Sequence, residues 1–271
     1  MVAHRAALSP AQIARYHEQG HLLVSGLLSV SELAELTAMA DRLHARGSIK
    51  GCFTIGTAEE IARDPLKLYP RMMHPHRVDP TAKRYMLHVG ILDALADLFG
   101  EEPLAAQSMW YWKPPGARGQ ALHQDNFYLR VHPGNCIAAW VAVDPADREN
   151  GGLVVAPGSH RLDIFCPEEA DLDQSFSRHF VPVPAGLEEA PVDMAPGDVL
   201  FFGGNLIHGS YPNRSAERFR RSFICHYVGA SSEQVARFYR PLFRRGGREV
   251  VLDDAPEDGG PCGEYTPTGP H

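Results

Sequence analysis

Apolar residues recur at helical spacing in three stretches of the first hundred positions. One stretch follows Ser9, a second follows Ser29 and a third covers 89–99. The first two begin with a serine suited to the N-cap and carry Gln or Glu three residues later, a pattern typical of helix starts. Each stretch ends at a glycine, in turn Gly20, Gly47 and Gly100. We therefore expect three helices whose apolar stripes pack against the rest of the chain.

After residue 105 the helical spacing gives way to short apolar or alternating runs separated by Gly, Pro and Asn. Such runs are typical of strands, and they cover 106–113, 122–131, 136–143, 153–155, 199–202, 206–210 and 218–226. The stretch 231–242 is expected to add a short helix. Many short strands with helices beside them predict an all-β protein with flanking helices, built as a double-stranded β-helix, the cupin-like jelly-roll barrel.

The length of 271 residues allows one large β domain, predicted over 1–252, followed by a Gly/Pro-rich tail over 253–271. The net charge of −7 is modest and dispersed, which argues against nucleic acid or an anionic membrane as the main partner. No apolar run is long enough to span a bilayer, and the first residues lack the features of a secretory signal. A cytoplasmic protein, either monomeric or homodimeric, is expected.

The five cysteines show no spacing typical of a metal site or a redox motif. Their number is odd and no Cys-x-x-Cys pair occurs among Cys52, Cys136, Cys166, Cys225 and Cys262. Neither a disulfide framework nor a zinc cluster is indicated, so free thiols are expected.

A His-x-Asp triplet, His123 to Asp125, lies within one of the predicted strands. Residues two apart in an extended segment face the same way, so these two side chains are expected to point to one face. A second histidine, His208, follows a predicted strand and a glycine-rich turn, whereas His160 is expected to be structural. Two imidazoles and one carboxylate form the facial triad of non-haem Fe(II) oxygenases. The predicted metal ligands are therefore His123, Asp125 and His208.

An arginine run follows His208. Arg220 interrupts the apolar strand predicted over 218–226, and a guanidinium that points inward from such a strand must be paired with an anion. A dicarboxylate would supply that anion and could be held bidentately. Arg220 is the first choice for this anchor, and Arg218 is the alternative.

Several short motifs occur in order along the chain: Leu122–Asp125, residues 149–160, His208–Ser210, Phe219–Arg220 and Cys225–His226. Together, from about residue 8 to residue 229, they closely resemble the phytanoyl-CoA dioxygenase family, which belongs to the Fe(II)/2-oxoglutarate-dependent oxygenases. The chain departs from the family in one place. The family's arginine often stands eleven residues after the distal histidine, where this chain has Phe219, so a one-residue insertion in 211–217 is needed to bring Arg220 into its place.

The resemblance implies Fe(II), 2-oxoglutarate and O2 as cofactors. It also implies hydroxylation of an aliphatic C–H bond, with succinate and CO2 as co-products. Gln107 and Lys113 would look into the barrel near 2-oxoglutarate, Ser210 would assist the arginine, and Trp140 would stand beside the iron. From the residues alone, Lys113 could equally be a solvated charge and Trp140 a core residue. Since halogenating relatives lack the carboxylate, Asp125 favours hydroxylation, with desaturation or ring closure as alternatives.

The substrate is expected to be a small polar or anionic metabolite, such as a phosphonate or a natural-product intermediate. The irregular segment 69–77 is either a lid over the substrate or a solvated loop; it contains Arg71, His74, His76 and Arg77. Together with Arg118 and Arg130, its arginines favour an anionic group. Two other functions remain open: a non-catalytic cupin-like binding protein, and a zinc or manganese enzyme on the same barrel.

Overall fold

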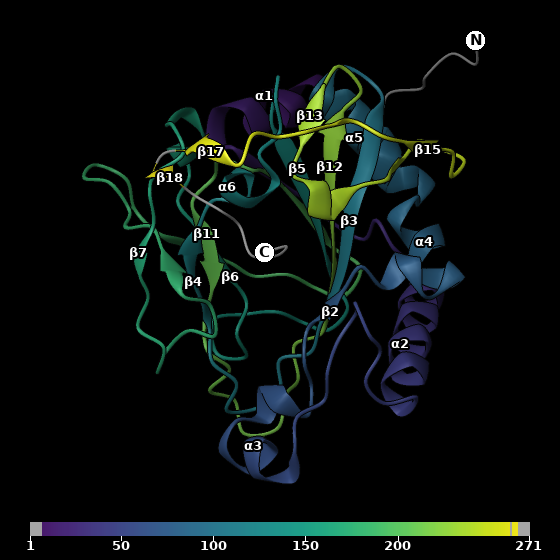
Figure 1. The fold of residues 1–271 in the computed structure, drawn as a ribbon, viewed down its shortest axis with the longest axis vertical. Helices are drawn as coiled ribbons and strands as arrows, with labels where there is room; N and C mark the ends of the chain where they lie inside the picture. The colour runs from purple at the N-terminus through teal and green to yellow at the C-terminus, as the bar shows by residue number, and fades with distance from the viewer. Residues whose placement is uncertain (1–6, 261, 265–271) are drawn as a thin grey trace.

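The computed structural model describes residues 7–260 and 262–264, and its main strands form two sheets that face each other (Figure 1). The larger sheet has the strand order β1-β10-β5-β12-β3-β14-β15, with β2 beside β3, and the smaller has the order β4-β11-β6-β9. In the described part of the chain the two sheets are not joined into one closed hydrogen-bonded barrel. The jelly-roll arrangement with flanking helices confirms the predicted fold class.

The larger sheet consists of β1 (His21–Val24), β2 (Met72–Met73), β3 (Pro103–Tyr111), β5 (Cys136–Ala142), β10 (Val199–Gly203), β12 (Ser222–Gly229), β14 (Leu242–Phe243) and β15 (Glu249–Val250). The smaller sheet consists of β4 (Gln120–His123), β6 (Leu153–Val155), β9 (Ala190–Val192) and β11 (His208–Ser210). Further short strands pair as β7 (Glu168–Glu169) with β8 (His179–Phe180), β13 (Gln234–Val235) with β16 (Asp253–Asp254), and β17 (Asp258–Gly260) with β18 (Gly263–Glu264).

The helices are α1 (Pro10–Gln19), α2 (Val30–Ala45), α3 (Ala58–Arg63), α4 (Pro80–Met86), α5 (Val89–Phe99) and α6 (Asn126–Leu129), with 3-10 turns η1 (Pro65–Lys67), η2 (Pro75–Arg77), η3 (Ser159–Arg161) and η4 (Arg237–Tyr239). The starts of α1 and α2 are the predicted capping boxes at Ser9 and Ser29. Gly20 and Gly100 end α1 and α5 in the left-handed conformation that glycine adopts readily.

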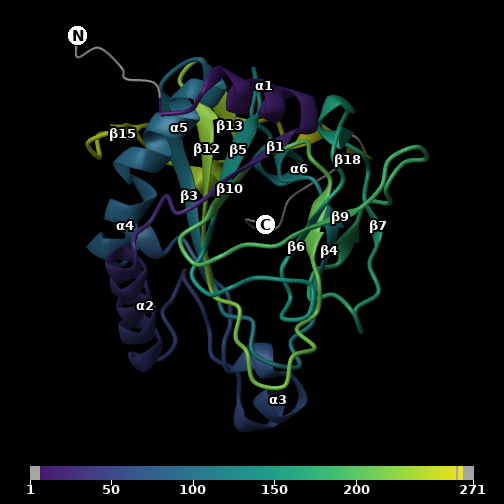
Figure 2. The same cartoon turned by 180° about the vertical axis from the view of Figure 1, so that it is seen from behind.

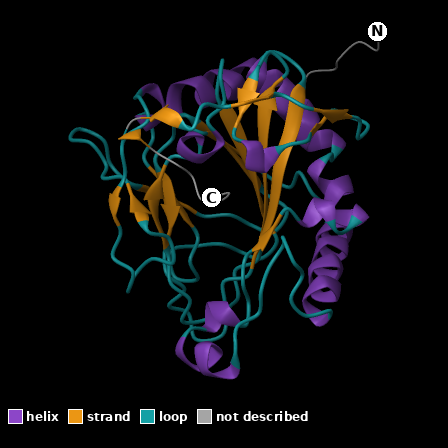
Figure 3. Cartoon of the chain, in the orientation of Figure 1, coloured by secondary structure: helices purple, strands orange, loops and turns teal. Residues whose placement is uncertain are grey.

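The helices α2, α4 and α5 cover the outer face of the larger sheet, whereas loops and the short strands β7 and β8 flank the smaller one (Figures 1, 2 and 3). Alternation along β10 divides the core: Phe201 packs with the helices, and Leu200 and Phe202 point into the space between the sheets. The space between the sheets is thus lined by one face of each, and that is where the candidate site lies.

Two predicted elements differ from the structure. The stretch 231–242 is not an α-helix but the strand β13 followed by η4. In this segment the apolar residues Val235 and Tyr239 are buried beside β5 and β12. Tertiary packing therefore overrides the local helical pattern. The predicted tail over 253–271 lies partly outside the described residues; its described part forms β16, β17 and β18.

The expectation of free thiols is wrong for one pair of cysteines. Cys166 and Cys262 form a disulfide with their Cα atoms 5.0 Å apart, across a sequence separation of 96 residues. Cys52, Cys136 and Cys225 are free and buried. Sequence spacing gave no signal because the fold alone brings the two partners together. Within residues 7–260 and 262–264, no helix has the length and apolar character needed to cross a bilayer.

Candidate active site

The structure brings the three predicted metal ligands together between the sheets. Oδ1 of Asp125 lies 3.4 Å from Nε2 of His123 and 3.6 Å from Nε2 of His208. One donor atom from each residue lies within 4.8 Å of the other two. All three side chains are buried. Two imidazole nitrogens and one carboxylate oxygen at this spacing can hold one metal ion on one side.

The two histidines meet because β4 and β11 pair with His123 directly opposite His208. Asp125 reaches the site through a backbone conformation that differs from the predicted strand. The strand ends at His123, and Asp125 has helical dihedral angles, φ −64 and ψ −36, at the start of α6. The Asn126 N–H donates to the carbonyl of Gly204 at 2.9 Å and fixes this turn. The prediction of a continuous strand over 122–131 is therefore wrong, although its two ligands do converge.

The backbone orients both imidazole rings for metal binding. Nδ1 of His123 lies 2.8 Å from the carbonyl of Ala121, and Nδ1 of His208 lies 3.0 Å from that of Leu206. These contacts assign the proton to Nδ1 and leave the lone pair of Nε2 directed at the site. Burial lowers the pKa of His208 to about 4, so its ring is neutral near pH 7. The Gln120 amide lies 3.2 Å from Nε2 of His123, and a metal ion would replace it as partner of that nitrogen.

A residue to which sequence reasoning gave no role, His226, holds the other oxygen of the carboxylate. Its Nε2 lies 2.9 Å from Oδ2 of Asp125, and both side chains are 1 % exposed. A bulge in the pairing of β12 with β3 falls at His226 and Tyr227, and bulges of this kind re-aim side chains next to functional sites. The signal was present in the sequence, because His226 lies an even number of residues from Arg220 and therefore shares its strand face.

A cavity extends from the metal ligands to Arg220. Arg220 precedes β12, but its backbone still pairs with that of Lys113 through two hydrogen bonds. Its guanidinium is buried, donates to the carbonyl of Gly151 at 3.1 Å and to Oγ of Ser222 at 2.6 Å, and lies 5.2 Å from the ring centre of Trp140. Burial lowers the pKa of Arg220 to about 10, so the group stays cationic.

No carboxylate in the described part of the chain forms an ion pair with Arg220. Asp144, which acts on it electrostatically, is already held by Arg221 through two hydrogen bonds of 2.8 and 2.7 Å. A buried cation without an anionic partner is unfavourable unless a ligand supplies the charge. Arg220 is therefore suited to an anion that enters the cavity.

Lys113 lies at the same end of the cavity as Arg220. The alternative interpretation, that Lys113 is a solvated charge, is wrong. Its side chain is buried, and Nζ donates to Oγ of Ser210 at 2.8 Å and to the carbonyl of Tyr211 at 2.6 Å. Burial and the neighbouring Arg220 hold the pKa of Lys113 well below its usual range. Gln107 is also buried, but it pairs across the strands with His226, at the level of the metal ligands rather than of Arg220.

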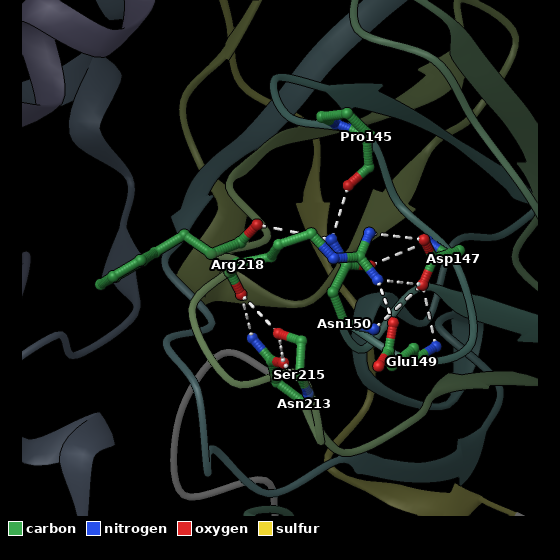
Figure 4. A network of polar contacts seen from close by, with 8 residues as sticks. Pro145, Asp147, Glu149, Asn150, Asn213, Ser215 and Arg218 are labelled. Atoms are coloured by element: carbon green, nitrogen blue, oxygen red, sulfur yellow. Dashed lines mark hydrogen bonds and ion pairs between the residues drawn. The ribbon is translucent and has the colours of Figure 1, made fainter.

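The alternative anchor, Arg218, lies on the surface in a different network (Figure 4). Its guanidinium donates to Asp147 at 2.6 Å and to Glu149 at 2.6 Å, and its side chain is 42 % exposed. Its backbone carbonyl accepts from Asn213 and Ser215 (Figure 4). Arg218 is thus already paired, and it does not line the metal cavity.

The predicted lid segment 69–77 divides into separate environments. Arg71 lies beside Tyr111, which lines the metal cavity. His74 and His76 are buried, and Arg77 binds the backbone carbonyls of residues 238 and 240. Arg71 is therefore next to a residue that forms a wall of the metal cavity. His160, expected to be structural, contacts the carbonyl of His17 and not the triad.

The chain resembles known proteins in sequence and in fold. A family model described as Phytanoyl-CoA dioxygenase (PhyH) matches residues 16–222. Phytanoyl-CoA dioxygenase 1 of Oryza sativa subsp. japonica is 31% identical, with 52% of this chain and 50% of that protein covered. Peroxisomal phytanoyl-CoA dioxygenase of Bos taurus is 28% identical, with 91% and 80% covered. The match to the rice protein thus spans about half of that relative's length, as does the match to the probable phytanoyl-CoA dioxygenase of Caenorhabditis elegans, at 51%.

Solved structures share the fold. The epimerase SnoN, in complex with Fe3+, alpha ketoglutarate and nogalamycin RO, superposes with a TM-score of 0.65 at 24% identity, and 85% of each chain is covered. The alpha ketoglutarate-dependent carbocyclase SnoK gives a TM-score of 0.67 at 21% identity, over 84% of this chain and 88% of that one. The family match covers more than half of the chain and includes all three predicted ligands. This chain belongs to the phytanoyl-CoA dioxygenase (PhyH) family.

Proposed function

We propose that this protein binds Fe(II) through His123, Asp125 and His208, binds 2-oxoglutarate through Arg220, and hydroxylates an aliphatic C–H bond of a small polar metabolite. One observation carries the proposal: three suitable donor atoms lie within 4.8 Å of one another in a cavity whose other end is a buried arginine without a carboxylate partner. A metal-binding protein of another kind would have no use for that cation.

The donor set fits iron. His123, Asp125 and His208 would hold the ion through two imidazole nitrogens and one carboxylate oxygen, a donor set typical of Fe(II) in oxygenases. When bound, Fe(II) together with 2-oxoglutarate and O2 supplies an oxidant that attacks C–H bonds, with succinate and CO2 as co-products. The remaining tasks of binding and water exclusion fall to the residues of the chain.

In this proposal the distal carboxylate of 2-oxoglutarate binds Arg220, and Lys113 with Ser210 adds donors beside it. Trp140 stacks on the guanidinium and limits its rotation. The walls between anchor and metal are apolar, formed by Met109, Trp140, Leu153, Phe202 and Ile224. Few waters can therefore compete for the space next to the metal, which protects the reactive centre from side reactions.

The outcome of oxidation is the finer part of the proposal. Hydroxylation is supported by the presence of Asp125, since its carboxylate takes the position that a halide would need. The fold also serves an epimerase and a carbocyclase among the solved structures. Desaturation and ring closure therefore remain the alternative outcomes of the same site.

The test is a succinate assay with a panel of small polar metabolites, including phosphonates and natural-product intermediates, followed by mass spectrometry under labelled O2. Hydroxylation predicts equal amounts of succinate and of a product that has gained one labelled oxygen atom. Succinate with a product that has lost two hydrogens would identify a desaturase or cyclase instead. Metal binding with no succinate for any metabolite would favour a non-catalytic protein, and turnover without 2-oxoglutarate would favour a zinc or manganese enzyme.

A further inference from the structure

A second cavity borders the metal cavity at the end where Arg220 lies. Tyr111 lines both cavities and is the wall between them. The second cavity is lined by parts of three loops and the end of β3, and the residues that decide its character are Asp64, Lys67, Arg71, Tyr111, Arg118 and Phe176. Three of these side chains are cationic and one is anionic.

The charges of this second cavity are not all balanced within the described residues. Arg118 neutralises Asp64 through a hydrogen-bonded ion pair of 2.6 Å and also donates to the carbonyl of Leu172 at 2.8 Å. Lys67 faces Glu60 at 4.0 Å. No described carboxylate pairs with Arg71, whose guanidinium donates to the phenol oxygen of Tyr111 at 3.1 Å. The unbalanced positive charge of the cavity is therefore that of Arg71.

Arg71 is held in a fixed place and keeps donors to spare. Its guanidinium carbon lies 5.7 Å from the ring centre of Tyr111 and 5.8 Å from that of Phe176, within the range of cation–π contacts. The side chain is partly buried. A guanidinium has five N–H donors, and only one of them is used by the bond to Tyr111. A cation that is already ordered by two rings loses little side-chain entropy when an anion binds to it.

We propose that the cavity around Arg71 is a second anion-binding site, which takes a carboxylate, phosphate or phosphonate group carried on a flat or apolar body. The anionic group would bind Arg71, and the body would lie against Tyr111, Phe176 and Trp112, which also lines the cavity. The same chemistry has two sources, the primary substrate and a second molecule of 2-oxoglutarate. That the primary substrate binds here rests on the proposed function, whereas binding of an anion to this cavity does not depend on it.

The first experiment measures binding to the full-length protein without metal, by calorimetry. The probes are phenylphosphonate, inorganic phosphate and the neutral benzyl alcohol. We expect phenylphosphonate to bind more tightly than phosphate, and benzyl alcohol to bind more weakly than both. In Arg71→Gln the affinity for phenylphosphonate should fall on the order of tenfold or more, because a charged hydrogen bond is removed. In Arg71→Lys, which keeps the charge, part of the affinity should return.

The matched control is Arg63→Gln. Arg63 lies on α3 close to the same loops, is 72 % exposed, pairs with Glu59 and does not line the cavity. Its replacement removes the same charge and should leave phenylphosphonate binding unchanged. The proposal is overturned if Arg71→Gln binds phenylphosphonate as the parent does, or if Arg63→Gln weakens binding equally, since the effect would then be one of net charge alone.

A second arm distinguishes the two sources and separates this proposal from the proposed function. In Arg220→Ala, phenylphosphonate binding should persist while 2-oxoglutarate binding at the metal cavity is lost. If 2-oxoglutarate also occupies the second site, its weaker binding phase should vanish in Arg71→Gln. If the primary substrate occupies it, Arg71→Gln should raise KM for anionic substrates and leave kcat nearly unchanged. Loss of phenylphosphonate binding in Arg220→Ala would show that the anion binds only in the metal cavity and would contradict a second site.

Discussion

The two sheets of this protein differ in what covers them and in what they contribute. The larger sheet is backed by α2, α4 and α5, and its outer face holds most of the apolar core. The smaller sheet is flanked by loops and by the short strands β7 and β8, yet it supplies His123 and His208. The larger sheet faces it with Arg220, Trp140 and His226. The largest apolar cluster thus lies on one sheet, and the metal ligands are carried mainly by the other.

This division has a physical consequence. A site between two sheets requires both to be correctly placed, and we expect the larger apolar cluster on the helix-covered side to contribute more to the free energy of folding. Substitutions on the two sides should therefore separate stability from metal binding, and the following predictions run from the largest expected effect to the smallest.

Leu36→Ala, in α2, removes a fully buried side chain from the helix-covered core. The free energy of unfolding should fall by roughly 2–5 kcal/mol, because a cavity is left in addition to the lost burial. Val155→Ala, beside His208 in the smaller sheet, should cost only about 2 kcal/mol. Denaturant unfolding with Fe(II) titration of the folded protein checks both. The comparison fails if Leu36→Ala weakens iron binding as much as Val155→Ala does.

Arg220→Ala should weaken 2-oxoglutarate binding by roughly 100-fold, because the buried charge partner of the distal carboxylate is lost. Arg218→Ala, two residues away, removes the same group from the surface network with Asp147 and Glu149 and should leave that affinity within about twofold. Fluorescence or calorimetric titration with 2-oxoglutarate distinguishes them. Equal losses in both variants would mean that Arg220 is not the anchor.

His226→Ala should weaken Fe(II) binding by about tenfold, because partners that orient a metal ligand typically contribute 10- to 100-fold in affinity. His226→Gln places an amide N–H near the position of Nε2 and should restore part of that loss by holding Oδ2 of Asp125. His76→Gln, a buried histidine bonded to Ser108 instead, is the control and should bind iron normally. Iron affinity unchanged in His226→Ala would show that Asp125 needs no such support.

Glu32→Gln in the capping box of α2 should have the smallest effect, about 0.5 kcal/mol at pH 7. Hydrogen bonds from Ser29 hold the pKa of Glu32 below its usual value of 4.5. Because its pKa is lower in the folded state, the Glu32 carboxylate stabilises the fold above its unfolded-state pKa. This stabilisation is lost as the pH falls through the folded-state pKa. The difference between parent and variant should therefore shrink below about pH 4, as measured by thermal unfolding across pH. A difference that grows in acid would contradict this assignment.

The sequence predicted an element correctly where the contacts that fix it join residues close together in the chain. The helix starts at Ser9 and Ser29 were predicted correctly because cap and partner lie three residues apart. The strand over 122–131 was wrong, because the turn at Asp125 is fixed by Gly204, far along the chain. The disulfide between Cys166 and Cys262 was missed for the same reason. Long-range contacts, which leave no periodic signal in the sequence, explain both the wrong strand and the missed disulfide.

The candidate site shows the same limit. His123, Asp125 and His208 could be chosen from residue type and motif order, and the structure places their donor atoms together. The choice between Arg220 and Arg218 could not be made from spacing, because it depends on which side chain enters the cavity and which meets Asp147 and Glu149. The alternation along the strand places His226 on the same face as Arg220, but its contact with Asp125 depends on how the two sheets pack, which the sequence does not show.

The central claim is that one metal site and one buried arginine across the two sheets act as a unit. Anaerobic titration with Fe(II) and then 2-oxoglutarate, followed in the visible spectrum, tests it most directly. The parent should develop the charge-transfer band of a keto acid chelated to Fe(II). Asp125→Ala should lose the band, and Arg220→Ala should require far more 2-oxoglutarate to form it. A parent protein that binds Fe(II) yet develops no band at saturating 2-oxoglutarate would contradict the claim.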